Sequence, residues 1–181
     1  KEIEDWPSVN LIVEKFFFKK SGGFGSQYWP GEDTFLFIKL LKIKKNSIFL
    51  YNPNLVVYHH RRSSLIHHLN QVGNYGLHRG YFAKRYPENS RKFMYFIPSL
   101  FFIFINFSIF FIFINVLSAF FIFGLMTYLF TMLCGLFDIY KIFKNILICF
   151  ASLPYIFLTH YYYGFMFIKG FLSSDLQSKL R

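Results

Sequence analysis

The longest stretch without a charged side chain runs from Phe93 to Phe137, and it constrains the fold more than any other feature of this 181-residue chain. The stretch covers 45 residues, whereas about 20 apolar residues are enough to cross a bilayer once as a helix. It also lacks the polar stripe of helical period that marks a surface helix of a soluble protein. We therefore expect two membrane spans, at Phe93–Ile114 and Leu117–Phe137, joined by a tight turn near Asn115 and Ser118.

A third apolar segment, Ile146–Ile168, follows the first two after Lys141 and Lys144. It is less uniformly apolar, because it contains Pro154, His160 and three consecutive tyrosines. Tyrosine is enriched where a membrane meets water. Two placements therefore stay open: the segment spans the membrane, or it lies obliquely at the interface. If it spans, the C-terminal end of the chain lies outside.

Charge divides the chain near Lys92. The formal net charge is +11, from 20 Lys and Arg against 9 Asp and Glu, and most of this excess lies before residue 93. Basic side chains flank the apolar hairpin on both sides and are absent from its turn, so both ends of the hairpin should be cytoplasmic. We expect residues 1–92 to form a cytoplasmic domain and residues 93–181 to form a membrane domain with two to three transmembrane or interfacial helices.

The composition excludes some classes of protein. Apolar residue types make up 54% of the chain, which is far too much for an intrinsically disordered protein. The positive charge suits a partner that carries phosphate, such as anionic lipid or a nucleotide. We expect no nucleic-acid partner, because the basic residues are scattered and no recognised binding motif occurs. Cys134 and Cys149 lie in apolar surroundings and form neither a disulfide framework nor a metal site.

The first 92 residues read as a mixture of strands and helices. Short runs rich in β-branched and aromatic residues predict strands, which are Ser8–Val13, Ile48–Tyr51 and Leu55–Tyr58. Longer runs between turn residues predict helices, which are Lys15–Lys20, Phe35–Leu41 and Ser64–Arg85, the last capped by Ser63 or Ser64.

Two polar groups in this half suggest chemistry. Glu32 and Asp33 lie in a glycine-containing turn at a helix start, where they either cap the helix or supply a general base. The run His59-His60-Arg61-Arg62 follows a predicted strand. Because Arg matches phosphate geometry and neutral His ligates metals, this run either binds a metal and a diphosphate or forms a solvated basic loop near anionic lipid.

A third polar group lies on one helix. Spacings of three and four residues bring side chains to one helical face, here Gln71, Asn74, Tyr75 and His78, with Arg79 beside them. The alternative interpretation is an ordinary amphipathic helix that rests on a membrane.

The order of these features resembles the C-terminal part of a membrane-bound family 2 glycosyltransferase. The features are Asn10, Ser21-Gly22-Gly23-Phe24, Gly31-Glu32-Asp33-Thr34, the strand ending at His60, the helix containing Gln71, and paired membrane spans. The resemblance covers essentially the whole chain. It implies an α/β fold, the C-terminal portion of a GT-A (Rossmann-like) domain, followed by α-helical transmembrane segments.

The resemblance also implies roles for residues. Asp33 would be the base that deprotonates the acceptor hydroxyl, Glu32 would help to hold the acceptor or its loop, and Gly22 and Gly23 would belong to the acceptor loop. Either His59 or His60 would contact the metal or the donor diphosphate, with His60 favoured. The remaining donor-side residues would be Arg61, Arg62, Gln71 and Arg79.

The sequence departs from the family pattern in two respects. The Gln-x-x-Arg-Trp motif of processive members is replaced by Gln71-Val72-Gly73-Asn74-Tyr75, and Arg79 would have to supply the missing cation from one turn later. No Asp-x-Asp metal motif occurs in the chain. We therefore expect the donor-binding half to lie upstream of Lys1 and the polypeptide alone to be an incomplete enzyme.

The resemblance predicts sugar transfer from a nucleotide-sugar to a lipid-linked or polysaccharide hydroxyl, with inversion at the anomeric carbon. It implies a divalent cation, Mg²⁺ or Mn²⁺, and a place in the cell membrane, in bacteria the inner membrane, in polysaccharide or envelope biosynthesis. Two other classes remain as alternatives: a small membrane transport subunit, and a basic lipid-binding membrane anchor without catalysis.

Overall fold

The computed structural model describes residues 8–25, 28–43, 48–60, 64–111 and 115–176. Within these ranges every regular element is a helix, and no β-strand occurs. A short 3-10 helix, Ser8–Asn10, is followed by the α-helices α1 (Lys15–Lys20), α2 (Glu32–Ile43), α3 (Leu65–Arg85), α4 (Pro87–Ser90), α5 (Phe93–Phe111), α6 (Asn115–Phe143) and α7 (Ile146–Leu172).

The predicted α/β fold, a Rossmann-like GT-A portion, is therefore wrong for the described residues. The predicted strand at Ser8–Val13 is in part a 3-10 helix, and the segments 48–51 and 55–58 form no strand, although Leu50 makes a single β-bridge. A strand needs a neighbouring strand for its backbone hydrogen bonds. The backbone of Leu55 instead makes hydrogen bonds within a turn and to a side chain. The Leu55 amide donates to the Asn52 carbonyl within a turn at 3.2 Å, and the Leu55 carbonyl accepts from Asn10 Nδ2 at 2.7 Å.

The three helices predicted in the first half are confirmed. α2 begins at Glu32, three residues before the predicted start, so both acidic residues lie in its first turn, where they complement the helix dipole. α3 is capped by Ser64, whose hydroxyl accepts from the His67 amide at 3.3 Å. This contact decides between the two serines that the sequence left open.

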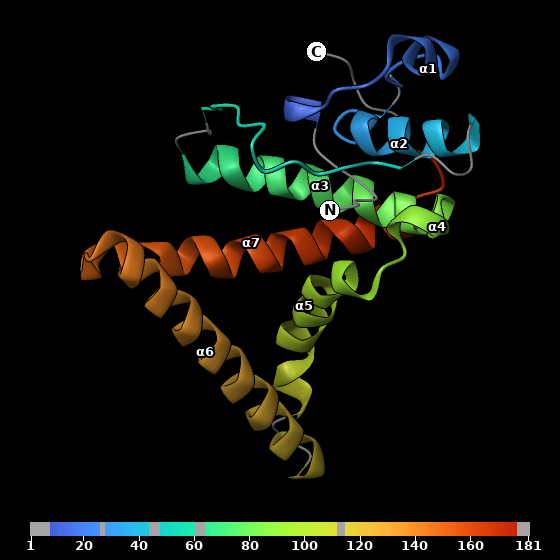
Figure 1. Cartoon of the computed structure of the whole chain (residues 1–181). Helices are drawn as coiled ribbons and strands as arrows, with labels where there is room; N and C mark the ends of the chain where they lie inside the picture. The colour runs from blue at the N-terminus through green and yellow to red at the C-terminus, as the bar shows by residue number, and fades with distance from the viewer. Residues whose placement is uncertain (1–7, 26–27, 44–47, 61–63, 112–114, 177–181) are drawn as a thin grey trace.

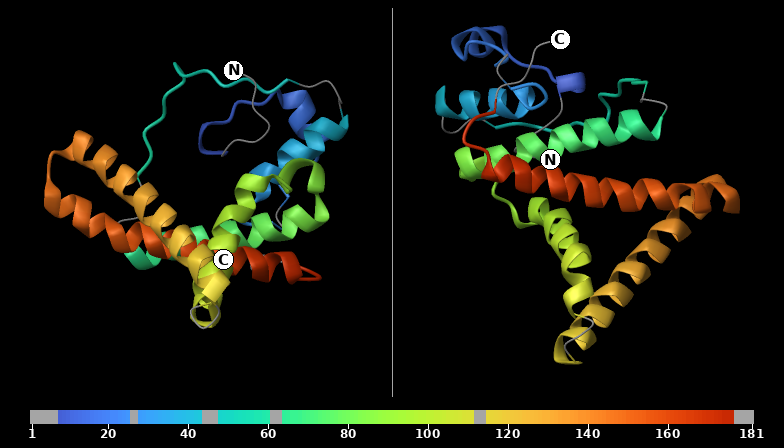
Figure 2. Two further views of the ribbon diagram at one scale, coloured as in Figure 1. Left: turned by 90° about the horizontal axis from the view of Figure 1, so that it is seen from below. Right: turned by 180° about the vertical axis from the view of Figure 1, so that it is seen from behind.

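The three long C-terminal helices outline a triangle (Figures 1 and 2). α5 and α6 meet at one corner and diverge from it, and α7 closes the third side. Asn115 and Ser118 were predicted to form the turn between α5 and α6, but both belong to α6. Ring contacts join the sides, among them Phe101 of α5 stacked on Tyr128 of α6 at 4.3 Å between centroids.

The exposed helices fit the expected membrane character in a coarse sense. Ser118–Phe143 in α6 and the whole of α7 are long and apolar enough to cross a membrane, and both are almost entirely unburied. In α5 the apolar part, Phe93–Ser108, is shorter. By length and composition the chain thus carries two long, largely exposed apolar helices, which is weak support for membrane association.

α3 and α7 run side by side in the same direction, as Figure 1 shows. Glycines let their backbones touch. A Cβ added to Gly76 would lie 2.7 Å from the Tyr163 carbonyl oxygen, and one added to Gly80 would overlap the Phe167 carbonyl. From the other side, a Cβ on Gly170 would overlap the Leu77 carbonyl. We call Gly76, Gly80 and Gly170 the glycine seam.

An aromatic cluster joins distant parts of the chain. Tyr28, Tyr81 and Phe82 are buried together, and Phe35, Tyr86 and Leu176 pack against them. The Tyr28 ring lies edge-on to Phe82 with centroids 5.0 Å apart. The cluster therefore fixes the start of α2 against the end of α3 and against the segment that follows α7.

Candidate functional site

The carboxylate turn, which we define as Gly31, Glu32 and Asp33, is organised by its own side chains. Gly31 has a φ of +128°, a region that side-chain-bearing residues avoid. The Glu32 carboxylate folds back and accepts from the Gly31 amide at 2.9 Å. Asp33 Oδ1 accepts from the Thr34 amide at 2.8 Å. Glu32 thus braces the turn, and both carboxylates lie at the N-terminal end of α2.

The carboxylate turn packs directly against α3. A Cβ added to Gly31 would lie 3.4 Å from the Phe82 ring and 3.6 Å from the Cβ of His78. These are ordinary van der Waals distances, so the backbone conformation, with φ of +128°, and not the space beside α3, is what requires glycine here. This packing brings the two candidate catalytic carboxylates beside the helix that carries Gln71, His78 and Arg79.

His78 is a buried neutral imidazole next to this turn. Its Nδ1–H donates to the Asn74 carbonyl at 2.9 Å, and its Nε2 has no hydrogen-bond partner among the described residues. Burial lowers the pKa of His78, and the bond to Asn74 offsets part of that effect. Because a carbonyl can only accept, Nδ1 carries the proton and Nε2 presents its lone pair. The sequence placed His78 on the polar face of its helix but gave it no role.

The expected acceptor loop is tied to α2. Gly22 and Gly23 have φ values of 74° and 65°, so the loop uses the left-handed conformation that glycine permits. The ammonium group of Lys39 donates a hydrogen bond to the Gly23 carbonyl. Desolvation lowers the pKa of Lys39. No role is predicted for Lys39 from the sequence. Its position on the helix that follows the two carboxylates could have marked it as a candidate site residue.

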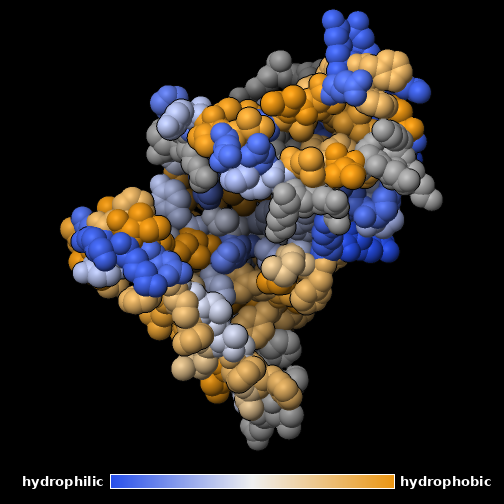
Figure 3. All heavy atoms as spheres, in the orientation of Figure 1, coloured by the Kyte–Doolittle hydropathy of each residue, from blue (hydrophilic) through white to orange (hydrophobic). Residues whose placement is uncertain are grey.

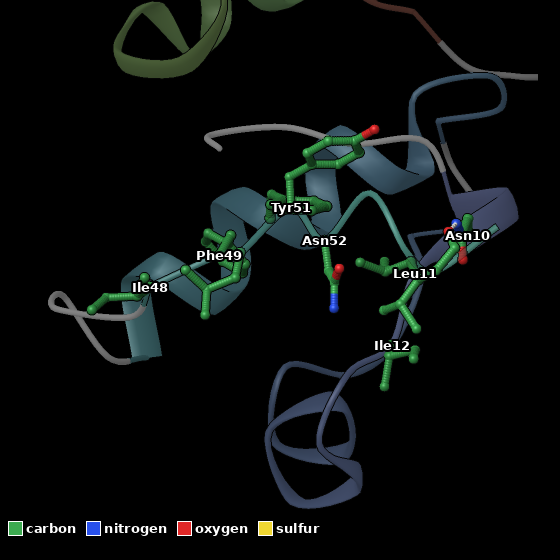
Figure 4. Close-up of a pocket in the computed structure, with 10 residues that line it drawn as sticks. Asn10, Leu11, Ile12, Ile48, Phe49, Tyr51 and Asn52 are labelled. Atoms are coloured by element: carbon green, nitrogen blue, oxygen red, sulfur yellow. Dashed lines mark hydrogen bonds between the residues drawn. The ribbon is translucent and has the colours of Figure 1, made fainter. Parts of the chain in front are cut away.

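A pocket of about 250 Å³ lies on another side of α2. Figure 4 shows that Asn10, Leu11 and Ile12 face the segment from Ile48 to Asn52 across it. Phe37 of α2 and Leu55 also line the pocket. The β-type segments predicted from the sequence thus form the wall of a pocket in place of a sheet.

The structure does not gather every residue of the predicted site. His59 and His60 are exposed in an irregular segment, and Arg61 and Arg62 lie outside the described residues. Gln71 is half-buried on α3. The donor-side histidines therefore have no role that their surroundings define.

Arg79 points away from the face that packs on the carboxylate turn. Its Nη1 donates to the Ser90 hydroxyl at 3.3 Å, and its guanidinium lies 4.6 Å from the centre of the Tyr95 ring. Arg79 therefore joins α3 to α4 and to the start of α5, and these contacts give it a structural role in addition to the predicted donor-side one.

The described residues do not form a binding site for the expected divalent cation. Within the described ranges no group of three or more His, Cys, Asp or Glu side chains is placed to hold a metal ion. His60, the favoured ligand, is exposed and has no such companions there. These residues on their own do not fit a metal.

Comparison with known proteins adds no identification, since no protein family, curated protein or solved structure matches the chain.

Proposed function

We propose that this protein acts in a membrane-bound glycosyltransferase of the family 2 type, with Asp33 as the base. The observation that supports this proposal most is the carboxylate turn, which Gly31 holds against α3 while Glu32 braces it from within. General base catalysis needs a carboxylate on a rigid element within hydrogen-bond reach of the reacting hydroxyl. Asp33, in the first turn of α2, meets the requirement for rigidity.

The two carboxylates have different roles in this reaction. The acceptor oxygen forms a bond to the anomeric carbon of the nucleotide-sugar as its proton passes to Asp33. The bond between that carbon and the diphosphate oxygen breaks, and the nucleoside diphosphate leaves with the electron pair. Glu32 keeps the turn in place through the Gly31 amide. The basic residues of the 59–62 run and of α3 are the expected partners of the departing negative charge.

The membrane part of the proposal places the site beside a lipid-linked or glycan acceptor. The apolar helices α5 and α6 would enter the membrane, in bacteria the inner membrane, and the residues before Phe93 would stay on the cytoplasmic side. The large exposed apolar surface of α6 supports this placement, because such a surface is stable in lipid and unfavourable in water.

The proposal is tested by the variant Asp33→Asn, made in the complete reading frame and assayed in membranes for sugar transfer. Loss of a general base lowers kcat by about 100-fold to 10,000-fold, whereas binding of the nucleotide-sugar should be nearly unchanged. Asp138→Asn is the matched control, because Asp138 is an exposed carboxylate on α6 that pairs only at the surface with Lys141. Transfer at the wild-type rate by Asp33→Asn would refute the assignment.

The variant Glu32→Gln tests whether Glu32 stabilises the carboxylate turn or takes part in the chemistry. An amide oxygen can still accept from the Gly31 amide, so we expect Glu32→Gln to retain much more activity than Glu32→Ala. Equal and complete loss in both variants would instead assign Glu32 to the chemistry.

The alternative with structural support is a basic lipid-binding anchor without catalysis. Its support is the combination of exposed apolar helices with lysines at their ends, such as Lys141, Lys144 and Lys169. Membranes that contain the intact protein and show no sugar transfer with any nucleotide-sugar, while anionic lipid binding persists, would favour the anchor.

A further inference from the structure

α7 is long and apolar enough to span a membrane, but its neighbour α3 is not. α3 carries His67, Arg79, Lys84 and Arg85, and its terminal basic residues are exposed. Charged side chains are costly at the centre of a bilayer. α3 therefore has to stay at the surface of the membrane or outside it.

The contacts between α3 and α7 hold the two helices parallel along their lengths, with α3 on the side of α7 away from the α5–α6 hairpin (Figures 1 and 2). Near the start of α3, His68 Nε2 lies 2.8 Å from the Thr159 hydroxyl. The glycine seam follows in the middle, and at the far end Lys84 Nζ donates to the Ser173 carbonyl at 3.2 Å. The partners advance together along both helices. Because backbones touch at the seam, α7 cannot descend into the bilayer without losing α3.

The segment after α7 returns to the first half of the chain. Leu176 packs against the aromatic cluster of Tyr28, Tyr81 and Phe82. A helix that carried the chain across a membrane would place Leu176 on the side opposite to Tyr28. The contact instead places the end of α7 on the side that holds residues 8–92.

We infer that α7 does not cross the membrane but lies along the surface of a bilayer with anionic headgroups, with α3 packed on its face away from the α5–α6 hairpin. We call the pair of α3 and α7 the platform. Only the hairpin of α5 and α6 enters the lipid. This inference rests on the membrane part of the proposed function and is independent of sugar transfer. It also decides between the two placements that the sequence left open for this segment.

The distribution of charge agrees with a bilayer as the partner of the platform. Hydrophilic atoms gather at the corner where α6 meets α7, whereas the corner where α5 meets α6 is largely apolar in Figure 3. Lys141 and Lys144 lie at the first of these corners, and Lys169 lies in the last turn of α7. Basic side chains at this level can pair with anionic headgroups.

The hairpin has the dimensions that this arrangement requires. At about 1.5 Å per residue, the 19 residues of α5 are about 28 Å long and the 29 residues of α6 about 43 Å. A hydrocarbon core is about 30 Å thick. α5 thus matches it nearly upright, and the longer α6 matches it when tilted, as the diverging sides of the triangle show (Figure 2).

Thiol labelling in sealed membrane vesicles of both orientations tests the sidedness. Cys134 and Cys149 are first replaced by Ser, and single cysteines are then introduced at exposed positions. We expect Ser174→Cys to react from the same side as Asn54→Cys, and Ala119→Cys at the other end of the hairpin not to react from that side. Reaction of Ser174→Cys from the side opposite to Asn54→Cys would overturn the inference.

Spin labels then measure depth along each helix. At exposed α7 positions such as Leu147, Phe150 and Phe165, exposure to oxygen relative to a water-soluble nickel complex should follow the helical period without a central maximum. Labels on α6 at Phe120, Phe130 and Phe137 serve as the control and should show a single maximum near the middle. A maximum of the α6 type along α7 would refute the surface placement.

The outcomes also separate this inference from the proposed function. If neither α6 nor α7 reaches lipid, the membrane part of the proposed function fails and the platform fails with it. If α6 enters lipid and α7 stays at the surface, the inference holds whether or not Asp33→Asn abolishes sugar transfer.

Discussion

α6 and α7 are both long apolar helices, yet they differ in what surrounds them. α7 lies against α3 through the glycine seam and buries Phe167 to 2% exposure. α6 touches its neighbours mainly through scattered rings, and its Phe130 remains 66% exposed. The comparison shows that hydropathy identifies an apolar helix but does not tell whether lipid or protein covers it. The small residues on the facing helix carry that information.

The largest effect should come from removing the ring at the centre of the pair. Phe167→Ala leaves a cavity among Phe96, Tyr163 and Phe171, whose rings surround it. We expect a loss of about 3–5 kcal/mol in the free energy of unfolding, measured by denaturation in detergent micelles. Phe130→Ala on α6 is the control and should cost much less. Similar losses at both positions would mean that the two helices are equally packed.

A single methyl group in the glycine seam should have the next largest effect. Gly80→Ala places a carbon on the Phe167 carbonyl, so the backbones have to separate, and we expect a loss of about 3 kcal/mol. Crosslinking between cysteines at positions 68 and 159 reports the separation directly.

Gly135→Ala provides the matched change on α6. No atom lies within 4 Å of a Cβ at Gly135, and Ala is a better helix former than Gly by up to about 1 kcal/mol. Gly135→Ala should therefore be neutral or slightly stabilising. A loss as large as that of Gly80→Ala would show that α6 has a close partner at this position.

Acid should weaken the packing of α3. Burial lowers the pKa of His78 in the folded state, so the unfolded chain binds a proton at a higher pH than the folded chain does. Stability is then fully present above the ordinary histidine pKa of about 6.5 and falls as the pH drops below it. The slope is at most about 1.4 kcal/mol per pH unit for one proton. His78→Gln should flatten this part of the profile, and an unchanged slope would exclude His78 as its source.

The smallest effects should come from the helix caps of the platform. The Asn145 side chain accepts from the Leu147 and Ile148 amides at 2.9 and 3.4 Å, and Ser64 caps α3. Each change to Ala should cost about 1 kcal/mol. The double variant should lose close to the sum of the two, because the caps do not touch the same groups. A markedly different sum would indicate that the two helix starts are coupled.

The sequence predicted those parts of the fold that depend on local signals. Ser64 and the acidic pair Glu32–Asp33 mark helix starts correctly, and the charge-free run correctly predicts long apolar helices. The strands predicted at 48–51 and 55–58 are wrong, because β-type composition cannot show whether a partner strand exists. The side chains of 48–51, together with Leu55, line a pocket instead.

The arrangement around the candidate site depends on contacts distant in sequence, and local patterns do not contain them. Gly31 approaches His78 and Phe82, which follow it by 47 and 51 residues, and Lys39 reaches the loop at Gly23. Isolated glycines such as Gly76 and Gly80 lower helix propensity. Only the position of α7 explains them, because glycine is what lets the two backbones meet.

The glycine seam also determines the order in which parts of the protein assemble during synthesis. His68 and its partner Thr159 are separated by 91 residues, and the α5–α6 hairpin lies between them in the chain. The glycine face of α3 therefore stays uncovered while the ribosome makes the hairpin. α3 acquires its partner only after α7 has emerged, so the pair of α3 and α7 assembles after the hairpin has been made.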